Sequence, residues 1–194
     1  MPNKLVGSMV PCKLRTGISF DQTLYIMHRE AILAYDLLSV TRGLESNSEN
    51  MKKFLEPLGD AGVVPLDAVT ECYKFNDVDL KDNPMNISFE VRLDTQIIGV
   101  MTLSRKNIGN DDINWMRSNY KIDDYVNFDR HRARSQAFIT NFVISPVFSR
   151  WTRFVVREVM RMFMKTVIYF QHERDVCPTR EISDEFLPVA PRRR

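Results

Sequence analysis

Cysteine, glycine and long apolar runs are all scarce in this chain. The three cysteines are odd in number and far apart, at Cys12, Cys72 and Cys177, which favours reduced thiols in a cytosolic compartment over a disulfide framework. None has a second Cys or a His at metal-ligand spacing, so we expect no metal site. No run of about eighteen apolar residues occurs, and the N-terminal residues lack the apolar stretch of a secretory signal. We therefore expect neither membrane contact nor secretion.

What the chain does have is enough apolar content for one ordinary domain, because 44% of its 194 residues are apolar. Its formal net charge of +2 conceals an asymmetry. From Glu45 to Asp82, nine acids oppose four lysines and give −5; from Arg130 to Lys165, seven arginines and one lysine oppose Glu158 and give +7. This distribution suits docking to charged neighbours better than nucleic-acid binding, which usually shows an overall basic excess.

Residues 1–85 are predicted to be helical at first and then mainly loop. Apolar residues recur at helical spacing from Phe20 onwards, which predicts a helix over about residues 20–41. A second helix is predicted over residues 48–57, where Pro57 and Gly59 are expected to end it.

Residues 86–175 hold the clearest strand signals and are expected to form the sheet core. Apolar and polar residues alternate in "NISFEVRL", and "QIIGVMTLSR" follows the short Asp94-Thr95 turn, so a hairpin is predicted. A helix through Asn119 and a charged loop from Arg130 to Arg134 follow. Then come an interior strand over residues 135–146, a helix over residues 151–164 and a buried-type strand over residues 165–170.

The last strand, helix and strand are most simply one crossover within a single sheet. Residues 176–194 are rich in proline and arginine and look like a linker or tail. The expected architecture is therefore α/β, with a mixed sheet flanked by helices.

The turn before the helix over residues 151–164 contains no glycine, and none occurs from Ser145 to Lys165. The order of elements resembles the acetyltransferase fold of the GNAT superfamily, in which a V-x-P-x-[YF] strand end precedes a [QR]-x-x-G-x-[GA] turn. Those glycines let the backbone approach the pyrophosphate of acetyl-coenzyme A at a helix N-terminus. Ile144, Pro146 and Phe148 match the strand end, whereas Thr152 and Phe154 take the two glycine positions. The resemblance therefore implies a degenerate coenzyme-binding turn, no cofactor and no enzymatic activity.

Two strand residues could still be nominated as catalytic groups, Glu90 as base and Tyr169 as acid. No triad, paired carboxylate or metal-ligand spacing supports them. We interpret both as ordinary strand residues and expect no catalytic residue.

Several segments in residues 86–194 also resemble the cilia- and flagella-associated protein 61 family. They are "FEVRLDTQIIGVMTL", "INWMRSNYKIDDYVNF", "FVISPVFSRWTRFVVREVMRMFMKTVIYF" and "FLPVAPRRR". The resemblance implies a structural subunit of the motile ciliary or flagellar axoneme, in the calmodulin- and spoke-associated complex at the base of radial spokes on doublet microtubules. This chain is far shorter than the family's usual members, so we expect a short paralogue or a single module, without the family's reductase-like domain.

Arginines recur every three or four residues along the helix over residues 151–164 and form one basic stripe. The stripe and the nearby charged loop are the predicted partner-docking residues: Arg130, Arg132, Arg134, Arg150, Arg153, Arg157 and Arg161. Expected partners are other radial spoke and calmodulin- and spoke-associated complex proteins, and tubulin directly or indirectly. Three alternatives stay open: a merely solvated helix face, a calmodulin target over residues 150–165, and an active protein N-acetyltransferase.

Overall fold

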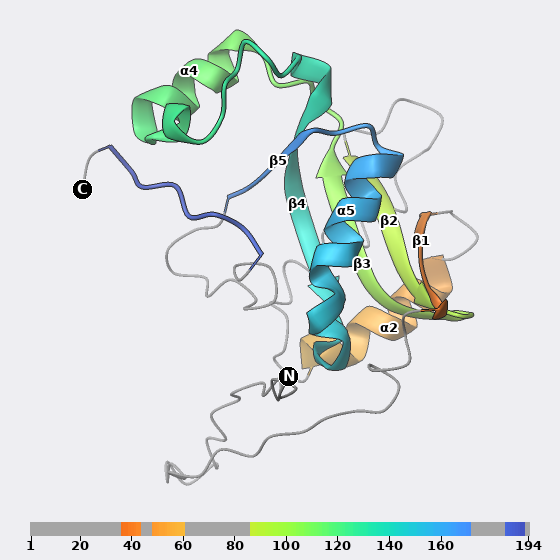
Figure 1. Ribbon diagram of the computed structural model, residues 1–194. Helices are drawn as coiled ribbons and strands as arrows, with labels where there is room; N and C mark the ends of the chain where they lie inside the picture. Colours follow the sequence, from red (N-terminus) through yellow and green to blue (C-terminus); the bar gives the residue numbers. More distant parts are fainter. Residues whose placement is uncertain (1–35, 44–47, 61–85, 172–184, 193–194) are drawn as a thin grey trace, which may run out of the picture.

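A five-stranded mixed sheet forms the centre of the fold (Figure 1). The computed structural model describes residues 36–43, 48–60, 86–171 and 185–192. The main elements are β1 (Leu38–Arg42), α2 (Ser48–Asp60), β2 (Asn86–Leu93), β3 (Gln96–Ser104), α4 (Asn110–Asn119), β4 (Gln136–Ile144), α5 (Thr152–Met162) and β5 (Val167–Phe170). Short 3₁₀ helices lie between the later elements: η3 (Ile122–Asp124), η4 (Ala133–Ser135) and η5 (Pro146–Trp151). The strands lie in the order of the sequence; β1 to β4 are antiparallel, and β5 is parallel to β4.

Helices cover both faces of this sheet. Neighbouring residues of a strand point to opposite faces, and Met101 of β3 packs in the cluster that contains Val155 and Val159 of α5. Its neighbour Val100 packs with Met51 and Leu55 of α2. The predicted α/β class, a mixed sheet flanked by helices, is confirmed.

The predicted hairpin is confirmed, with β2 and β3 joined at Asp94 and Thr95. Asp94 adopts the left-handed conformation, with φ of 55°, which a short aspartate side chain tolerates better than most residues. The predicted helix through Asn119 is also present, as α4.

The crossover from β4 through α5 to β5 is present as well, but β5 is less buried than predicted. It pairs with β4 only from Gln136 to Ile139, and its four residues are half-buried. The reason is its position at the edge of the sheet, where β4 is its only neighbouring strand among the described residues. β4 contains a bulge at Thr140: its residues Ile139 and Asn141 pair with two consecutive residues of β3, which leaves Thr140 between them without a partner in the register.

The prediction of a helix over about residues 20–41 is wrong at its end, where β1 begins at Leu38. This segment pairs antiparallel with β2, from Leu38 opposite Leu93 to Arg42 opposite Phe89. The backbone partners that β2 supplies decide the conformation of this short segment. The rest of the predicted helix, residues 20–35, lies outside the described residues. Since β1 belongs to the sheet, the sheet core also extends N-terminal to residue 86.

The predicted end of the second helix at residue 57 is also wrong, because α2 continues through Pro57 to Asp60. A proline removes one intrahelical hydrogen bond, here in the last turns of the helix. Leu58, just beyond it, packs against the cluster of Met51 and Leu55. Tertiary packing therefore holds the final turn.

The C-terminal tail was predicted to be a linker, but residues 185–192 pack on the domain. Phe186 packs against the main core, with its ring centroid 6.3 Å from that of Phe170. The Lys121 amide donates to the Ala190 carbonyl at 2.9 Å, and the Arg192 amide donates to the Asn119 carbonyl at 2.8 Å. This segment joins the end of α4 to the sheet, as Figure 1 shows.

Candidate partner-docking surface

The turn that the sequence singles out, between β4 and α5, is the 3₁₀ helix η5. Phe148 is buried and packs in the core, and its amide donates to the Ser145 carbonyl at 2.8 Å. At the other end of η5, the Thr152 amide donates to the Ser149 carbonyl, and its hydroxyl donates to the same carbonyl at 2.7 Å. These backbone and side-chain groups are committed to the turn itself.

The two positions that would carry glycine in the acetyltransferase pattern hold packed side chains. Thr152 is fully buried. Phe154 is half-buried and lies edge-on to Trp151 with 6.4 Å between ring centroids. Packed side chains therefore occupy both positions at the start of α5.

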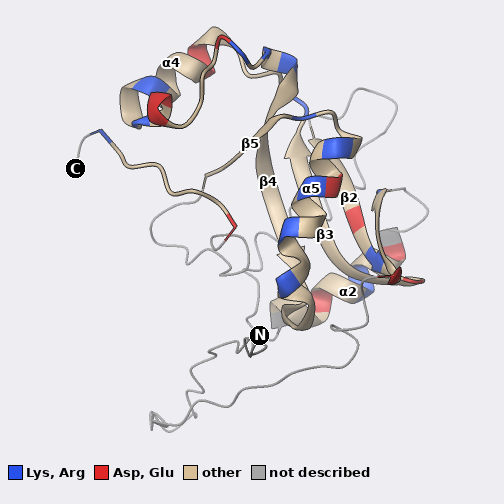
Figure 2. Cartoon of the chain, in the orientation of Figure 1, with Lys and Arg blue, Asp and Glu red and all other residues tan. Residues whose placement is uncertain are grey.

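The predicted basic stripe lies on the exposed side of α5, and Figure 2 shows its Lys and Arg bands along the helix. The side chains of Arg153, Arg157 and Arg161 are 85%, 69% and 71% exposed. Arg150 is also exposed, with its guanidinium carbon 5.5 Å from the Trp151 ring centroid. The structure thus brings all four stripe arginines to one solvent-facing side.

Two glutamates pair with this stripe. Glu185, from the C-terminal segment, contacts Arg153 with 3.0 Å between Oε2 and Nε. Glu158 contacts Arg161 at 2.8 Å and Arg157 at 3.3 Å. The Arg161 guanidinium that hydrogen-bonds to Glu158 holds the pKa of this carboxyl below its usual range. Because the arginines are largely exposed, these pairs contribute little stability, of the order of 0–1 kcal/mol each, and leave the guanidinium groups accessible.

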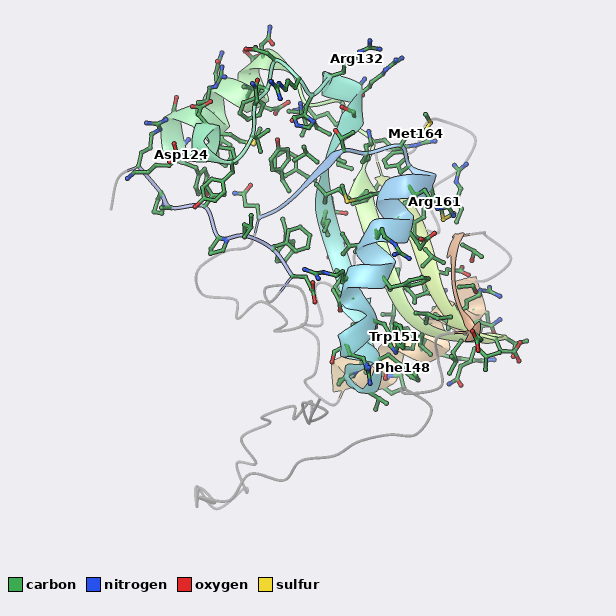
Figure 3. The ribbon with its side chains drawn as sticks, in the orientation of Figure 1. Asp124, Arg132, Phe148, Trp151, Arg161 and Met164 are labelled. Atoms are coloured by element: carbon green, nitrogen blue, oxygen red, sulfur yellow. The ribbon has the colours of Figure 1, made fainter. Side chains whose placement is uncertain are left out.

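The charged loop lies at the C-terminal end of α5, where several hydrogen bonds hold its backbone. The Lys165 ammonium donates to the Arg134 carbonyl at 2.5 Å. The Thr166 amide donates to the Ser135 carbonyl at 2.7 Å, and the Thr166 hydroxyl lies 2.9 Å from Nδ1 of His131. Burial lowers the pKa of Lys165. These contacts fix the loop against the helix end, and Figure 3 shows Arg132 and Arg161 in this part of the molecule.

The three loop arginines are exposed, and no side-chain partner is seen for them among the described residues. We call the loop and stripe arginines together the basic surface: Arg130, Arg132, Arg134, Arg150, Arg153, Arg157 and Arg161. Within the described part of the chain, no ion pair is seen for the loop arginines, whereas Arg153, Arg157 and Arg161 of the helix pair loosely with glutamates.

The two nominated catalytic residues are far apart. Glu90 is on β2 and Tyr169 is on β5, three strand spacings away in the sheet order, or about 14 Å at the usual spacing. Glu90 is fully buried and pairs with Arg92 at 2.7 Å. The Tyr169 hydroxyl donates to the Gln136 side-chain carbonyl at 2.8 Å, and burial raises the pKa of Tyr169 to about 12. These positions and contacts do not form an acid–base pair.

The described residues form neither a metal site nor a membrane-spanning helix. No group of three His, Cys, Asp or Glu side chains is placed to hold a metal ion in the described residues. Of the helices that the structure describes, none has the length and apolarity to span a bilayer. The acidic region from Glu45 to Asp82 falls mostly outside the described residues, apart from α2.

Sequence reasoning named the arginines but missed the residues that organise them. Lys165 was counted only as a charge, although it fixes the loop to the helix end. Glu185 was placed in a linker, although it reaches Arg153. The spacing of Glu158 three residues before Arg161 was a usable local signal, whereas the pairing of Glu185 had none.

In sequence, the chain is similar to a cilia- and flagella-associated protein. The chain is 22% identical over 177 residues to cilia- and flagella-associated protein 61 of Tetrahymena thermophila. The match covers 90% of this chain, and the chain spans only 10% of the length of that protein. The expected resemblance to this protein is confirmed. No family model matches the chain.

Similar solved structures are acetyltransferases. A ribosomal-protein-alanine N-acetyltransferase from Brucella melitensis biovar Abortus 2308 is 8% identical, with a TM-score of 0.47 over 79% of this chain and 92% of that one. An aminoglycoside acetyltransferase from an uncultured soil metagenomic sample, in complex with sisomicin, is 11% identical, with a TM-score of 0.45 over 79% and 89% of the two chains.

Proposed function

We propose that this chain is a non-catalytic docking module of the motile ciliary axoneme, a pseudo-acetyltransferase in the calmodulin- and spoke-associated complex at the radial spoke base. The similarity to a cilia- and flagella-associated protein over 90% of the chain supports the ciliary setting. The observation that carries the docking role is the basic surface, whose loop is fixed against the end of α5 by Lys165 and Thr166. Because the loop backbone is already fixed, binding need not order that backbone and so loses less conformational entropy.

The absence of catalysis is part of this proposal, and the turn before α5 supports it. A coenzyme pyrophosphate needs free backbone amides and close approach of the chain. Here the amides of Phe148 and Thr152 donate to carbonyls of the turn, and Thr152 is fully buried. Calorimetry with acetyl-coenzyme A tests the alternative, an active protein N-acetyltransferase. We expect no heat of binding, and micromolar affinity would overturn this part of the proposal.

The partner that fits the basic surface is an acidic protein, such as tubulin or a neighbouring spoke protein. Exposed charges attract over about 10 Å at 0.1 M salt and are screened at higher salt. A tagged chain should therefore stay in the axoneme through detergent extraction and leave it only at high salt. Recovery in the soluble detergent fraction would remove the scaffold role.

A charge-reversal variant sharpens this experiment. Arg132→Glu with Arg134→Glu changes two exposed side chains that have no ion pair to lose among the described residues, so we expect a native fold and loss of axonemal incorporation. The matched control is Lys53→Glu with Lys121→Glu, which gives the same change in net charge at exposed positions outside the basic surface. Normal incorporation of the arginine variant would refute docking through this surface.

Calmodulin binding by residues 150–165 is the remaining alternative, and the packing of α5 disfavours it. A helical target lays its apolar face in the calmodulin groove, but Val155 and Val159 on that face are fully buried against the sheet. We expect a calcium-dependent gel shift with the isolated peptide and none with the folded chain. A shift with the intact chain would favour this alternative.

A further inference from the structure

The C-terminal end of α5 has a geometry that usually requires glycine. The Lys165 amide donates to the Met160 carbonyl at 2.8 Å, and the Met164 amide donates to the Arg161 carbonyl at 3.3 Å. This is the Schellman arrangement, in which the residue just past the helix adopts the left-handed conformation. That residue is Met164, with φ of 53°. A residue with a β-carbon is strained there, whereas glycine is not.

The side chain of Met164 is also unusually exposed. It is 82% exposed, the highest value among the exposed large apolar side chains in the described part of the chain. Neighbouring Met162 is 38% exposed. Neither the backbone strain nor the solvated apolar side chain helps the isolated domain to fold. Met164 is therefore a large apolar side chain that is fully available for contact with a partner.

Several cations belong to the same end of α5 as this methionine. Arg161 and Lys165 flank it in the chain, and Lys165 holds the loop that carries Arg132 and Arg134. The Lys165 ammonium lies 4.4 Å from the Phe163 ring centroid, which keeps it at the helix end. Figure 3 shows Met164 projecting outward between Arg132 and Arg161. Met164 is thus an exposed apolar side chain among the arginines at this end of the basic surface.

We propose that Met164 is the apolar anchor of the basic surface, and that its partner is a protein with an apolar pocket rimmed by carboxylates. This inference rests on the proposed docking function and specifies its centre. Interfaces commonly concentrate their binding energy in a few anchors that fill pockets, surrounded by polar rims. A second copy of this chain would bring like charges together, which opposes self-association here. A phosphate backbone offers charge but no apolar pocket for the methionine.

A lipid surface is a poorer partner than a protein. Membrane-bound helices bury a broad apolar face in the lipid, but the apolar face of α5 is used in the core through Val155 and Val159. One projecting methionine suits a pocket, and the surrounding cations select an acidic rim.

The decisive variant is Met164→Gly, because stability and docking should respond differently. Glycine suits the left-handed conformation, so the melting temperature should be unchanged or higher. Loss of one buried methionine side chain should weaken binding about tenfold or more. The purified 194-residue chain is titrated onto salt-extracted axonemes, and the bound fraction is measured. Leu187→Ser is the matched control, since Leu187 is 76% exposed but lies in the C-terminal segment.

Each outcome has a distinct meaning. Weaker binding of Met164→Gly with retained melting temperature, and normal binding of Leu187→Ser, supports the anchor. Normal binding of Met164→Gly together with loss of binding by the Arg132 and Arg134 variant overturns the anchor and leaves the docking function intact. If neither variant affects binding, the docking function fails too. A lower melting temperature for Met164→Gly, or Met164-dependent binding to phosphatidylserine vesicles, would also overturn the anchor.

Discussion

The contact between Tyr169 and Gln136 gives a prediction whose magnitude can be worked out. Gln136 is fully buried; its carbonyl accepts from Tyr169 at 2.8 Å, and its amide donates to the His131 carbonyl at 2.9 Å. Tyr169→Phe removes the donor but keeps the ring, whose centroid lies 5.3 Å from that of Phe138. A buried acceptor left without its donor costs about 1–3 kcal/mol. Since Tyr169 is only half-buried, we expect a loss near the lower end, about 1–2 kcal/mol.

The pH dependence of this loss has a definite sign. Burial raises the pKa of Tyr169 to about 12 in the folded chain, above the value of about 10 for an unfolded tyrosine. The contribution of the phenol is therefore fully present below pH of about 10 and is lost as the pH rises through about 12. The difference in unfolding free energy between the wild type and Tyr169→Phe should be constant at neutral pH and shrink in alkali.

Urea unfolding at about pH 8 and about pH 11.5 measures both effects. Tyr125→Phe is the control, because Tyr125 is 50% exposed and no side-chain partner is seen for its hydroxyl among the described residues. This control should match the wild type at the lower pH. Equal stability of Tyr169→Phe and wild type at that pH would refute the reasoning, as would a difference that stays constant in alkali. Because the Gln136 amide also donates to the His131 carbonyl, Tyr169→Phe should speed amide hydrogen exchange in the charged loop, residues 130–134.

Two further predictions concern the parts that flank the sheet. The Asp112 carboxyl accepts hydrogen bonds from the Lys106 ammonium at 2.8 Å and from the Gly109 amide at 3.0 Å, and these bonds lower its pKa. The stability that the carboxylate adds to the fold is therefore present above the pKa of the unfolded chain. It is lost as the pH falls through the lowered pKa of the folded chain. In Asp112→Asn, the melting temperature should therefore fall less steeply at acid pH than in the wild type. The same fall in both proteins would contradict this role of Asp112. Phe186→Ala should cost about 2 kcal/mol, less than for a fully buried phenylalanine, whereas exposed Leu187→Ala should cost nothing measurable in urea unfolding. Equal effects of the two would mean that the C-terminal segment does not pack on the core.

The elements that the sequence predicted well are those with a local cause. Alternation in residues 86–93 and the polar turn at Asp94 are enough to specify a hairpin, and the apolar centre of β4 indicates an interior strand. The missed elements depend on distant partners. β1 becomes a strand because β2, more than forty residues later, supplies its hydrogen bonds. The segment of residues 185–192 is ordered by α4 and Phe170, which its own composition does not reveal.

The candidate site divides in the same way. Arginine spacing on α5 follows from the helical period, so the stripe could be predicted. The position of the loop arginines follows from the parallel pairing of β4 and β5, which places Ser135 beside Thr166. The exposure of Met164 depends on where α5 ends. The sequence shows only that glycine is absent from Ser145 to Lys165, so that a residue with a β-carbon has to occupy the position just past the helix.

The helix dipole adds a separate argument that the stripe has a use beyond folding. The N-terminus of a helix carries a partial positive charge, so carboxylates are favoured there and cations cost about 0.3–1 kcal/mol each. The first turn of α5 contains no acidic residue. Arg150 and Arg153 lie at this end, where Arg153 is offset by Glu185 and Arg150 stacks on Trp151. At the opposite end Arg161 is favoured by the dipole. The helix dipole therefore favours Arg161 but disfavours Arg150 and Arg153, and these two are the arginines that an acidic partner would stabilise.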